Sequence, residues 1–188
     1  MINQIKQTKP WHKLWQSLSG LTLLLFIGFA VNFGMSLAFS GNSLAAEAEL
    51  TKAADFSLQD EAGNKLSLGD FKGKPLVLHF WATWCPYCKK LQPGLDKLRL
   101  ANVATDLQML AISFNEDEGA MPSQTLKERG IGINTVINGE SAARAYGVQG
   151  TPTTVFINRS GEIVWQTKIS DPNSPELARA VAFILQKE

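Results

Sequence analysis

An almost uninterrupted apolar run, PLVLHFWA, occupies residues 75–82 and leaves few choices for the fold around it. Such a run is typical of a β-strand buried on both faces, inside a sheet that helices cover on both sides. The two cysteines of the chain, Cys85 and Cys88, follow it directly. A helix is predicted over residues 86–101, with leucines at helical spacing. The sequence therefore places a Cys-x-x-Cys pair where a buried strand gives way to a helix.

The flanking sequence predicts further strands and helices in alternation. These are a β-hairpin turning at Gly63-Asn64, a buried strand at 107–115, a helix at 121–130, a short strand at 135–138, a short helix at 140–146, a hairpin over 153–168 and a last helix from Pro175. Alternating units followed by a hairpin predict an α/β fold with a mixed central sheet flanked by helices on both faces.

The N-terminal segment is basic and then uncharged. Residues 1–46 contain three lysines and no acidic residue, and residues 14–39 carry no charge. A helix over 21–39 would nearly cross a hydrocarbon core of about 30 Å. Positive charge before the span predicts that the rest of the chain lies outside the cytoplasmic membrane. We expect a signal or membrane anchor at 1–40, either kept in the inner membrane or cleaved near Ala46–Ala48.

The remaining chain predicts one domain. Residues 41–52 are small and polar, which suits a linker, and residues 53–188 are enough for a single packed domain. After residue 46 the chain holds 15 basic and 17 acidic residues, so nucleic acid is not an expected partner.

Three other uses of the cysteine pair are disfavoured by the sequence. A tetrahedral zinc site needs four Cys or His ligands, and the chain offers only His12 and His79 besides the pair. Haem attachment needs a histidine directly after the second cysteine, where the sequence has Lys89. A structural disulfide that closes so short a loop removes little chain entropy. No metal or cofactor is expected, and a redox-active pair is the favoured interpretation.

The position of the pair provides a redox mechanism. The helix start offers free N–H groups and a partial positive charge, which lower the pKa of Cys85 and favour its thiolate. Cys85 is thus the predicted nucleophile on a substrate disulfide, and Cys88, one turn further in, is the predicted resolving thiol. Pro86 suits the first helical turn, and the Pro86-Tyr87 dipeptide is expected to tune the potential.

Several motifs resemble known proteins. WATWCPYC at 81–88 resembles the active site of the thioredoxin superfamily, and GTPT at 150–153 resembles its cis-proline loop. More narrowly, residues 55–85 and GVQGTPTTVFIN at 147–158 resemble the TlpA/ResA group of exported, often membrane-anchored thiol-disulfide oxidoreductases. The likeness covers about residues 53–187. It implies a thioredoxin fold with an N-terminal β-hairpin, protein thiol or disulfide substrates, and a membrane thiol relay as electron donor.

The resemblance also implies roles for individual residues. Glu116 lies where related proteins carry an acidic residue near the active site, although a solvated loop carboxylate is an equal alternative. Pro152 is expected to be cis, so that the preceding residue presents its backbone to an extended substrate. The implied substrate-binding surface consists of Trp84, Pro86, Tyr87, Thr151 and Pro152.

His79 departs from the thioredoxin pattern. It lies two residues before Trp81, where thioredoxin has a buried aspartate that accepts a proton from the resolving thiol. A neutral imidazole can take or pass that proton, and burial would lower its pKa. The alternative is a core histidine that is hydrogen-bonded to the backbone.

Two other departures concern specificity. The Pro-Tyr dipeptide is that of glutaredoxins, but those proteins are smaller and lack the hairpin and anchor, so glutathione binding is not expected. The residue after Pro152 is Thr153, whereas the cytochrome-c-maturation subgroup has an acidic residue there. A dedicated haem-apoprotein reductase is therefore less supported.

The expected function is an exported thiol-disulfide oxidoreductase that reduces disulfides of extracytoplasmic proteins. The resemblance favours reduction, whereas the Pro-Tyr dipeptide allows a more oxidising potential. One alternative is a thiol peroxidase, but the peroxidatic pattern Pro-x-x-x-Thr-x-x-Cys fails at Leu78 and Ala82. The other is a non-catalytic binding module on the same scaffold, in which both cysteines would be dispensable.

Overall fold

The computed structural model of the protein describes residues 50–186. The expected signal or anchor at 1–40, with its uncharged stretch at 14–39, lies outside the described residues, and so does most of the expected linker at 41–52. Within the described range, none of the helices combines the length and the apolar character needed to span a membrane.

The described chain forms a six-stranded mixed sheet and a separate two-stranded hairpin. The elements in chain order are β1 (Thr51–Lys52), β2 (Ser57–Gln59), β3 (Lys65–Ser67), the 3₁₀ helix η1 (Leu68–Phe71), β4 (Leu76–Trp81), α1 (Pro86–Ala101), β5 (Gln108–Ser113), α2 (Pro122–Glu128), β6 (Asn134–Val136), α3 (Glu140–Ala145), β7 (Thr153–Ile157), β8 (Glu162–Thr167) and α4 (Pro175–Ile184). The strand order is β1-β8-β7-β4-β5-β6, and β4 pairs parallel with β5 and antiparallel with β7. The predicted mixed sheet and N-terminal hairpin are both confirmed.

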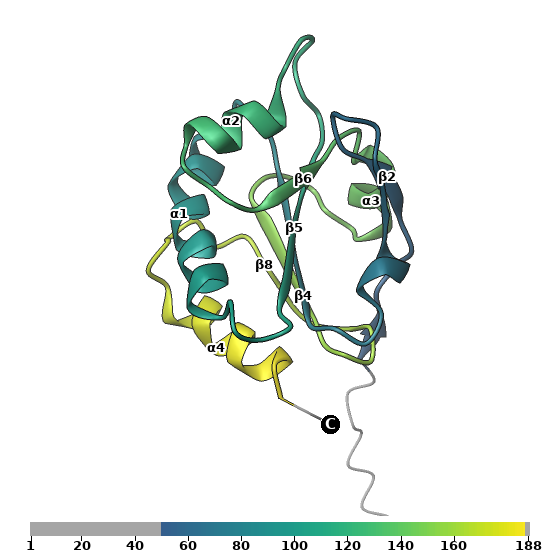
Figure 1. The fold of residues 1–188 in the computed structure, drawn as a ribbon, viewed down its shortest axis with the longest axis vertical. Helices are drawn as coiled ribbons and strands as arrows, with labels where there is room; N and C mark the ends of the chain where they lie inside the picture. Colours follow the sequence, from purple (N-terminus) through teal and green to yellow (C-terminus); the bar gives the residue numbers. More distant parts are fainter. Residues whose placement is uncertain (1–49, 187–188) are drawn as a thin grey trace, which may run out of the picture. The chain divides into compact units, whose positions relative to one another are not determined.

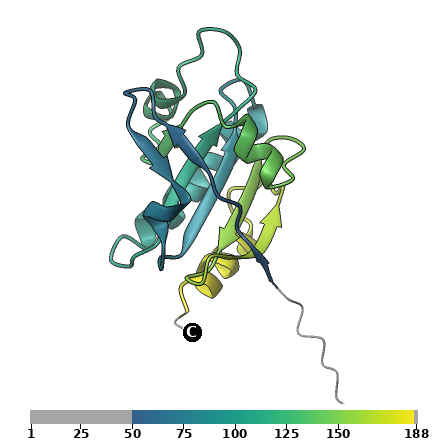
Figure 2. The same cartoon turned by 90° about the vertical axis from the view of Figure 1, so that its right-hand side faces the viewer.

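The central strand β4 contributes side chains to the hydrophobic core on each face of the sheet. All of its side chains are buried, and alternate residues point to opposite faces of the sheet. Helices α1, α2 and α4 cover one face, and α3 and the β2–β3 hairpin cover the other (Figure 1). Figure 2, which looks onto the second side, shows the hairpin and α3 in front of the sheet. This two-sided cover explains why residues 75–82 are almost wholly apolar.

The sheet register brings three loops that are distant in the sequence to the same end of the sheet. Trp81 at the end of β4 lies opposite Ser113 at the end of the parallel strand β5. Phe80 lies opposite Thr153, the first residue of the antiparallel strand β7. At this end of the sheet, where β4 and β5 finish and β7 starts, three segments meet: the one before Cys85, the loop after β5 and the loop before β7. The candidate site is built there.

Two local features differ from expectation. Thr51 and Lys52 were expected in the linker, but they pair with Ile163 and Glu162 of β8, so the linker ends before Thr51. The physical reason is the free edge of β8, which offers backbone groups that a short segment can pair with. The 3₁₀ helix η1 after the hairpin was also not expected.

Helix α1 matches its prediction and packs closely on the segment before α4. It continues past Pro93 without a break, and Gly94 follows directly. A Cβ at Gly94 would lie 2.2 Å from the carbonyl oxygen of Pro172, so only glycine allows the two backbones to approach this closely.

Candidate active site

Cys85 and Cys88 form a disulfide in this structure, with a Cα–Cα distance of 5.3 Å. Cys85 is the N-cap residue of α1, and its Sγ accepts a hydrogen bond from the backbone N–H of Cys88 at 3.1 Å. Pro86 occupies the first turn, where its missing N–H leaves no donor unsatisfied. An N–H donor at a helix start stabilises a thiolate at that sulfur, so the local structure suits thiol chemistry at Cys85.

The surface beside the disulfide is apolar and exposed. Cys85 and Cys88 are only 2% and 0% exposed, whereas Trp84 and Tyr87 are 53% and 61% exposed. The Trp84 ring is held in place, because its Nε1–H donates to the carbonyl oxygen of Asn115 at 2.8 Å. A partner that reaches the disulfide would therefore contact these aromatic rings first.

The Thr151–Pro152 bond is cis, as predicted. Pro152 is buried and Thr151 is half-buried. The hydroxyl of Thr153 donates to the carbonyl oxygen of Gly150 at 2.7 Å, which closes the loop before β7. This loop lies beside the end of β4 and is therefore at the same end of the sheet as the disulfide.

Glu116 binds the segment that leads into the disulfide. Its carboxylate accepts hydrogen bonds from the backbone N–H of Thr83 at 2.9 and 3.0 Å, and from the hydroxyls of Thr83 and Ser113. The alternative of a solvated loop carboxylate is therefore wrong for Glu116, although the neighbouring Asp117 and Glu118 are exposed. The physical reason is that β5 ends next to β4, which places the Glu116 carboxylate against the Thr83 backbone.

Arg129, which no sequence motif marked, binds the same segment. Its Nη2 donates to the carbonyl oxygen of Thr83 at 2.7 Å, and its Nη1 donates to Oε1 of Gln92 on α1 at 2.8 Å. The guanidinium also lies over the Trp81 ring, 5.6 Å from its centroid. Burial lowers the pKa of Arg129, and the nearby Glu116 carboxylate opposes this shift. Arg129 stays charged, because an arginine guanidinium is not deprotonated in proteins.

His79 is a buried and neutral side chain. Burial lowers its pKa from 6.5 to about 3. Within residues 50–186, neither ring nitrogen has a hydrogen-bond partner, so the alternative of a backbone-bonded core histidine is wrong. The strand alternation points His79 to the α1 face, as it does Trp81. Thr154 lies directly opposite on β7, and its buried hydroxyl also has no partner in that range.

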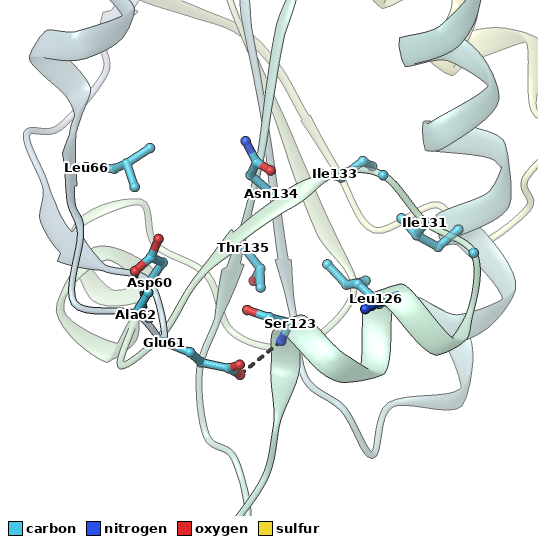
Figure 3. A pocket seen from close by; sticks show the side chains of 13 residues that line it. Asp60, Glu61, Ala62, Leu66, Ser123, Leu126, Ile131, Ile133, Asn134 and Thr135 are labelled. Carbon is cyan, nitrogen blue, oxygen red and sulfur yellow. Dashed lines mark hydrogen bonds between the residues drawn. The ribbon is translucent and has the colours of Figure 1, made fainter.

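A groove of about 720 Å³ is lined by a different set of residues (Figure 3). The turn of the β2–β3 hairpin, the edge strand β6 and α2 form its walls. The Glu61 carboxylate accepts a hydrogen bond from the backbone N–H of Ser123 at 2.9 Å and so ties the hairpin to α2. None of the expected site residues lines this groove. Residues 50–186 also contain no group of three His, Cys, Asp or Glu side chains placed to hold a metal ion.

Comparison with known proteins gives the family. Residues 50–166 match the model of the AhpC/TSA family. The chain belongs to this family. The thiol-disulfide oxidoreductase ResA of Halalkalibacterium halodurans is 34% identical over 161 residues, which cover 85% of this chain and 86% of that protein. ResA of Bacillus subtilis is 29% identical and covers 77% of this chain and 78% of its own.

Solved structures support the same assignment. A putative thiol:disulfide interchange protein DsbE from Chlorobium tepidum superposes with a TM-score of 0.64 at 26% identity, covering 73% of this chain and 97% of that one. A secreted disulfide oxidoreductase of Mycobacterium tuberculosis gives a TM-score of 0.59 at 26% identity, with 68% and 95% covered. The chain is thus a thioredoxin-fold thiol-disulfide oxidoreductase similar to ResA, and its Cys-x-x-Cys pair is present.

Proposed function

We propose that this chain is an exported reductase of protein disulfides and that the Cys85–Cys88 dithiol carries its electrons. One observation carries the proposal: the Cys85 sulfur caps the start of α1 and accepts the N–H of Cys88. In the reduced protein this donor and the helix dipole lower the pKa of Cys85, which makes it the nucleophile. Cys88 is fully buried and is the resolving thiol.

The reaction takes two exchange steps. The Cys85 thiolate attacks one sulfur of the substrate disulfide, so that a mixed disulfide forms and the other substrate sulfur leaves as a thiolate. Cys88 then loses its proton and attacks the sulfur of Cys85, which releases the second substrate thiol. Two electrons pass to the substrate, and the Cys85–Cys88 disulfide is left for the donor to reduce.

The substrate segment binds over the exposed rings beside the pair. Trp84 and Tyr87 provide an apolar surface for the substrate. Binding should cost Trp84 little side-chain conformational entropy, because its ring is already hydrogen-bonded to Asn115. Pro86 is exposed between the cysteines, and the Thr151 backbone before cis-Pro152 is the partner for an extended segment.

His79 passes the proton of Cys88 and does not store it. Its position on the α1 face of β4 places it on the side of the sheet where Cys88 lies. Burial lowers the pKa of this imidazole, so the ring is neutral at neutral pH and its unprotonated nitrogen is available to accept a proton in transit. Glu116 acts differently, as a positioning residue, because its hydrogen bonds go to Thr83 and Ser113.

Export rests on the N-terminal sequence. The uncharged stretch at 14–39 follows three lysines, and a related structure is that of a secreted protein. On this proposal the domain lies outside the cytoplasmic membrane, anchored through 14–39 or released by cleavage near Ala46–Ala48, and a membrane thiol relay reduces it. Alkaline extraction of membranes, followed by the mass of the intact chain, separates the two forms. Recovery of the full-length chain from cytosol would contradict export.

Insulin reduction tests the activity. The wild-type domain should catalyse dithiothreitol-driven precipitation of insulin, and Cys85→Ser should abolish it. Cys88→Ser should attack once and accumulate a mixed disulfide that a non-reducing gel detects. Equal activity of wild type and Cys85→Ser would exclude the enzyme and leave a binding module. Peroxide consumption that exceeds insulin reduction would instead support a thiol peroxidase.

A further inference from the structure

The segment that leads into Cys85 is hydrogen-bonded through both backbone groups of one residue, Thr83. The backbone N–H of Thr83 donates to the Glu116 carboxylate, and its carbonyl oxygen accepts from Arg129 Nη2 at 2.7 Å. The Thr83 carbonyl belongs to the peptide bond that leads into Trp84, and Cys85 follows. Opposite charges on the two groups therefore fix the backbone two residues before the reactive sulfur.

Arg129 also ties this segment to its surroundings. Its second fork nitrogen donates to Gln92, a fully buried residue of α1, so one guanidinium joins the helix that Cys85 caps to the segment before Cys85. The guanidinium lies over the ring of Trp81, whose Nε1–H donates to the hydroxyl of Thr135. A planar fork with several donors can make these contacts together, whereas a lysine ammonium cannot.

The charge of Arg129 balances that of Glu116. Glu116 is half-buried next to the Cys85 segment, and an unopposed carboxylate there would disfavour a second negative charge on the sulfur. The permanent positive charge of Arg129 offsets it from the other side of Thr83. Both groups are only partly exposed, which weakens solvent screening of their charges near the segment that leads to Cys85.

We propose that Arg129 is a positioning residue for disulfide exchange: its guanidinium fixes the peptide bond before Trp84 and offsets the Glu116 charge, so that Cys85 stays reactive at neutral pH. This inference rests on the proposed function, in which the Cys85 thiolate is the nucleophile. It assigns Arg129 no contact with substrate. It predicts that removal of the charge matters more than removal of one hydrogen bond.

The test compares Arg129→Gln with Arg129→Lys. Glutamine keeps an amide donor for the Thr83 carbonyl but has no charge, whereas lysine keeps the charge and loses the fork. Lys127→Gln is the matched control, because it removes an exposed positive charge from the last turn of α2, two residues before Arg129, which caps that helix. The readout is the rate of iodoacetamide alkylation of Cys85 in the reduced protein, measured from pH 4 to 10.

Arg129→Gln should raise the measured pKa of Cys85 by about one unit, which lowers the alkylation rate below that pKa about tenfold. The equilibrium of the Cys85–Cys88 pair with glutathione should shift about tenfold toward the disulfide in this variant. The reduction potential of the pair should therefore become about 30 mV more negative. Arg129→Lys should restore most of both values, and Lys127→Gln should match wild type. An unchanged pKa in Arg129→Gln, or an equal shift in Lys127→Gln, would overturn the proposal. Both assays use small reagents, so a failure to reduce insulin would not affect their outcome.

Discussion

The imidazole of His79 and the hydroxyl of Thr154 lie on directly paired residues of β4 and β7, and both are buried. Directly opposite residues of antiparallel strands bring their Cβ atoms within about 5.5 Å of each other. The sheet thus has a small polar pair in the face that α1 covers, next to strictly apolar neighbours such as Val77 and Ala111. This pair leads to two predictions about His79.

The buried histidine should make stability depend on pH. Its pKa is about 3 in the folded state and 6.5 in the unfolded chain, so the unfolded chain binds more protons between these values. Stability is therefore full above pH 6.5 and falls as the pH drops toward 3, by about 1.4 kcal/mol per pH unit. When the pH is lowered from 7.5 to 5, the free energy of unfolding of the wild type should fall by about 2 kcal/mol more than that of His79→Leu.

Urea titrations at the two pH values measure this difference. Thr154→Val is the matched control, because it removes the opposite hydroxyl and keeps the titrating imidazole. It should show the same pH slope as wild type. Parallel slopes for wild type and His79→Leu would mean that His79 is not buried in the neutral form.

His79→Leu should also slow the second exchange step. Without an acceptor on the α1 face, deprotonation of the Cys88 thiol relies on solvent, so release of the mixed disulfide should be slower at neutral pH and recover at high pH. Single-turnover quenched-flow kinetics separate this step from the first attack by Cys85. Identical release rates for wild type and His79→Leu at pH 7 would remove the proposed role.

Glu116→Gln should destabilise the fold. The carboxylate accepts the Thr83 N–H and two hydroxyls, and hydrogen bonds to a charged group are worth about 1.5–3 kcal/mol. We expect a loss in that range by urea titration. Glu118→Gln, an exposed neighbour, should stay within about 0.5 kcal/mol of wild type. Equal effects of the two substitutions would show that Glu116 is solvated in solution.

Gly94→Ala should be destabilising in spite of helix propensity. Alanine in a helix interior is favoured over glycine by about 1 kcal/mol. The added Cβ would lie 2.2 Å from the Pro172 oxygen, however, and separating the two backbones should cost about 1–3 kcal/mol. The thermal midpoint should fall for Gly94→Ala. It should not fall for Gly69→Ala, whose Cβ meets only Ser67 Oγ, at 3.6 Å. A raised midpoint for Gly94→Ala would contradict the close packing.

Local patterns were enough to predict the central elements. The helix over 86–101 was readable from Leu91 and Leu95, which are both buried, and from the Pro86 start. The strand before it was readable from its apolar run, because a strand covered on both faces has no polar side to interrupt the pattern. The edge β1 was missed, since two exposed residues acquire strand geometry only through pairing with β8.

The supporting contacts of the site could not be predicted. Arg129 contacts Thr83 across 46 positions of the chain, and Glu116 contacts it across 33. Neither spacing has a local signature, because each depends on where α2 and β5 end relative to β4. Glu116 was found only through a family resemblance, and Arg129 has no motif at all. Residues that touch the chemistry were thus recognisable, whereas residues that hold them in place required the fold.

The reduction potential of the Cys85–Cys88 pair tests the central claim most directly. It is measured by equilibrating the domain with defined glutathione or dithiothreitol buffers and quantifying the free thiols. A reductase of extracytoplasmic disulfides should have a potential near or below that of thioredoxin, about −270 mV. A value near that of the strong oxidant DsbA, about −120 mV, would contradict the account and reverse the direction of electron flow.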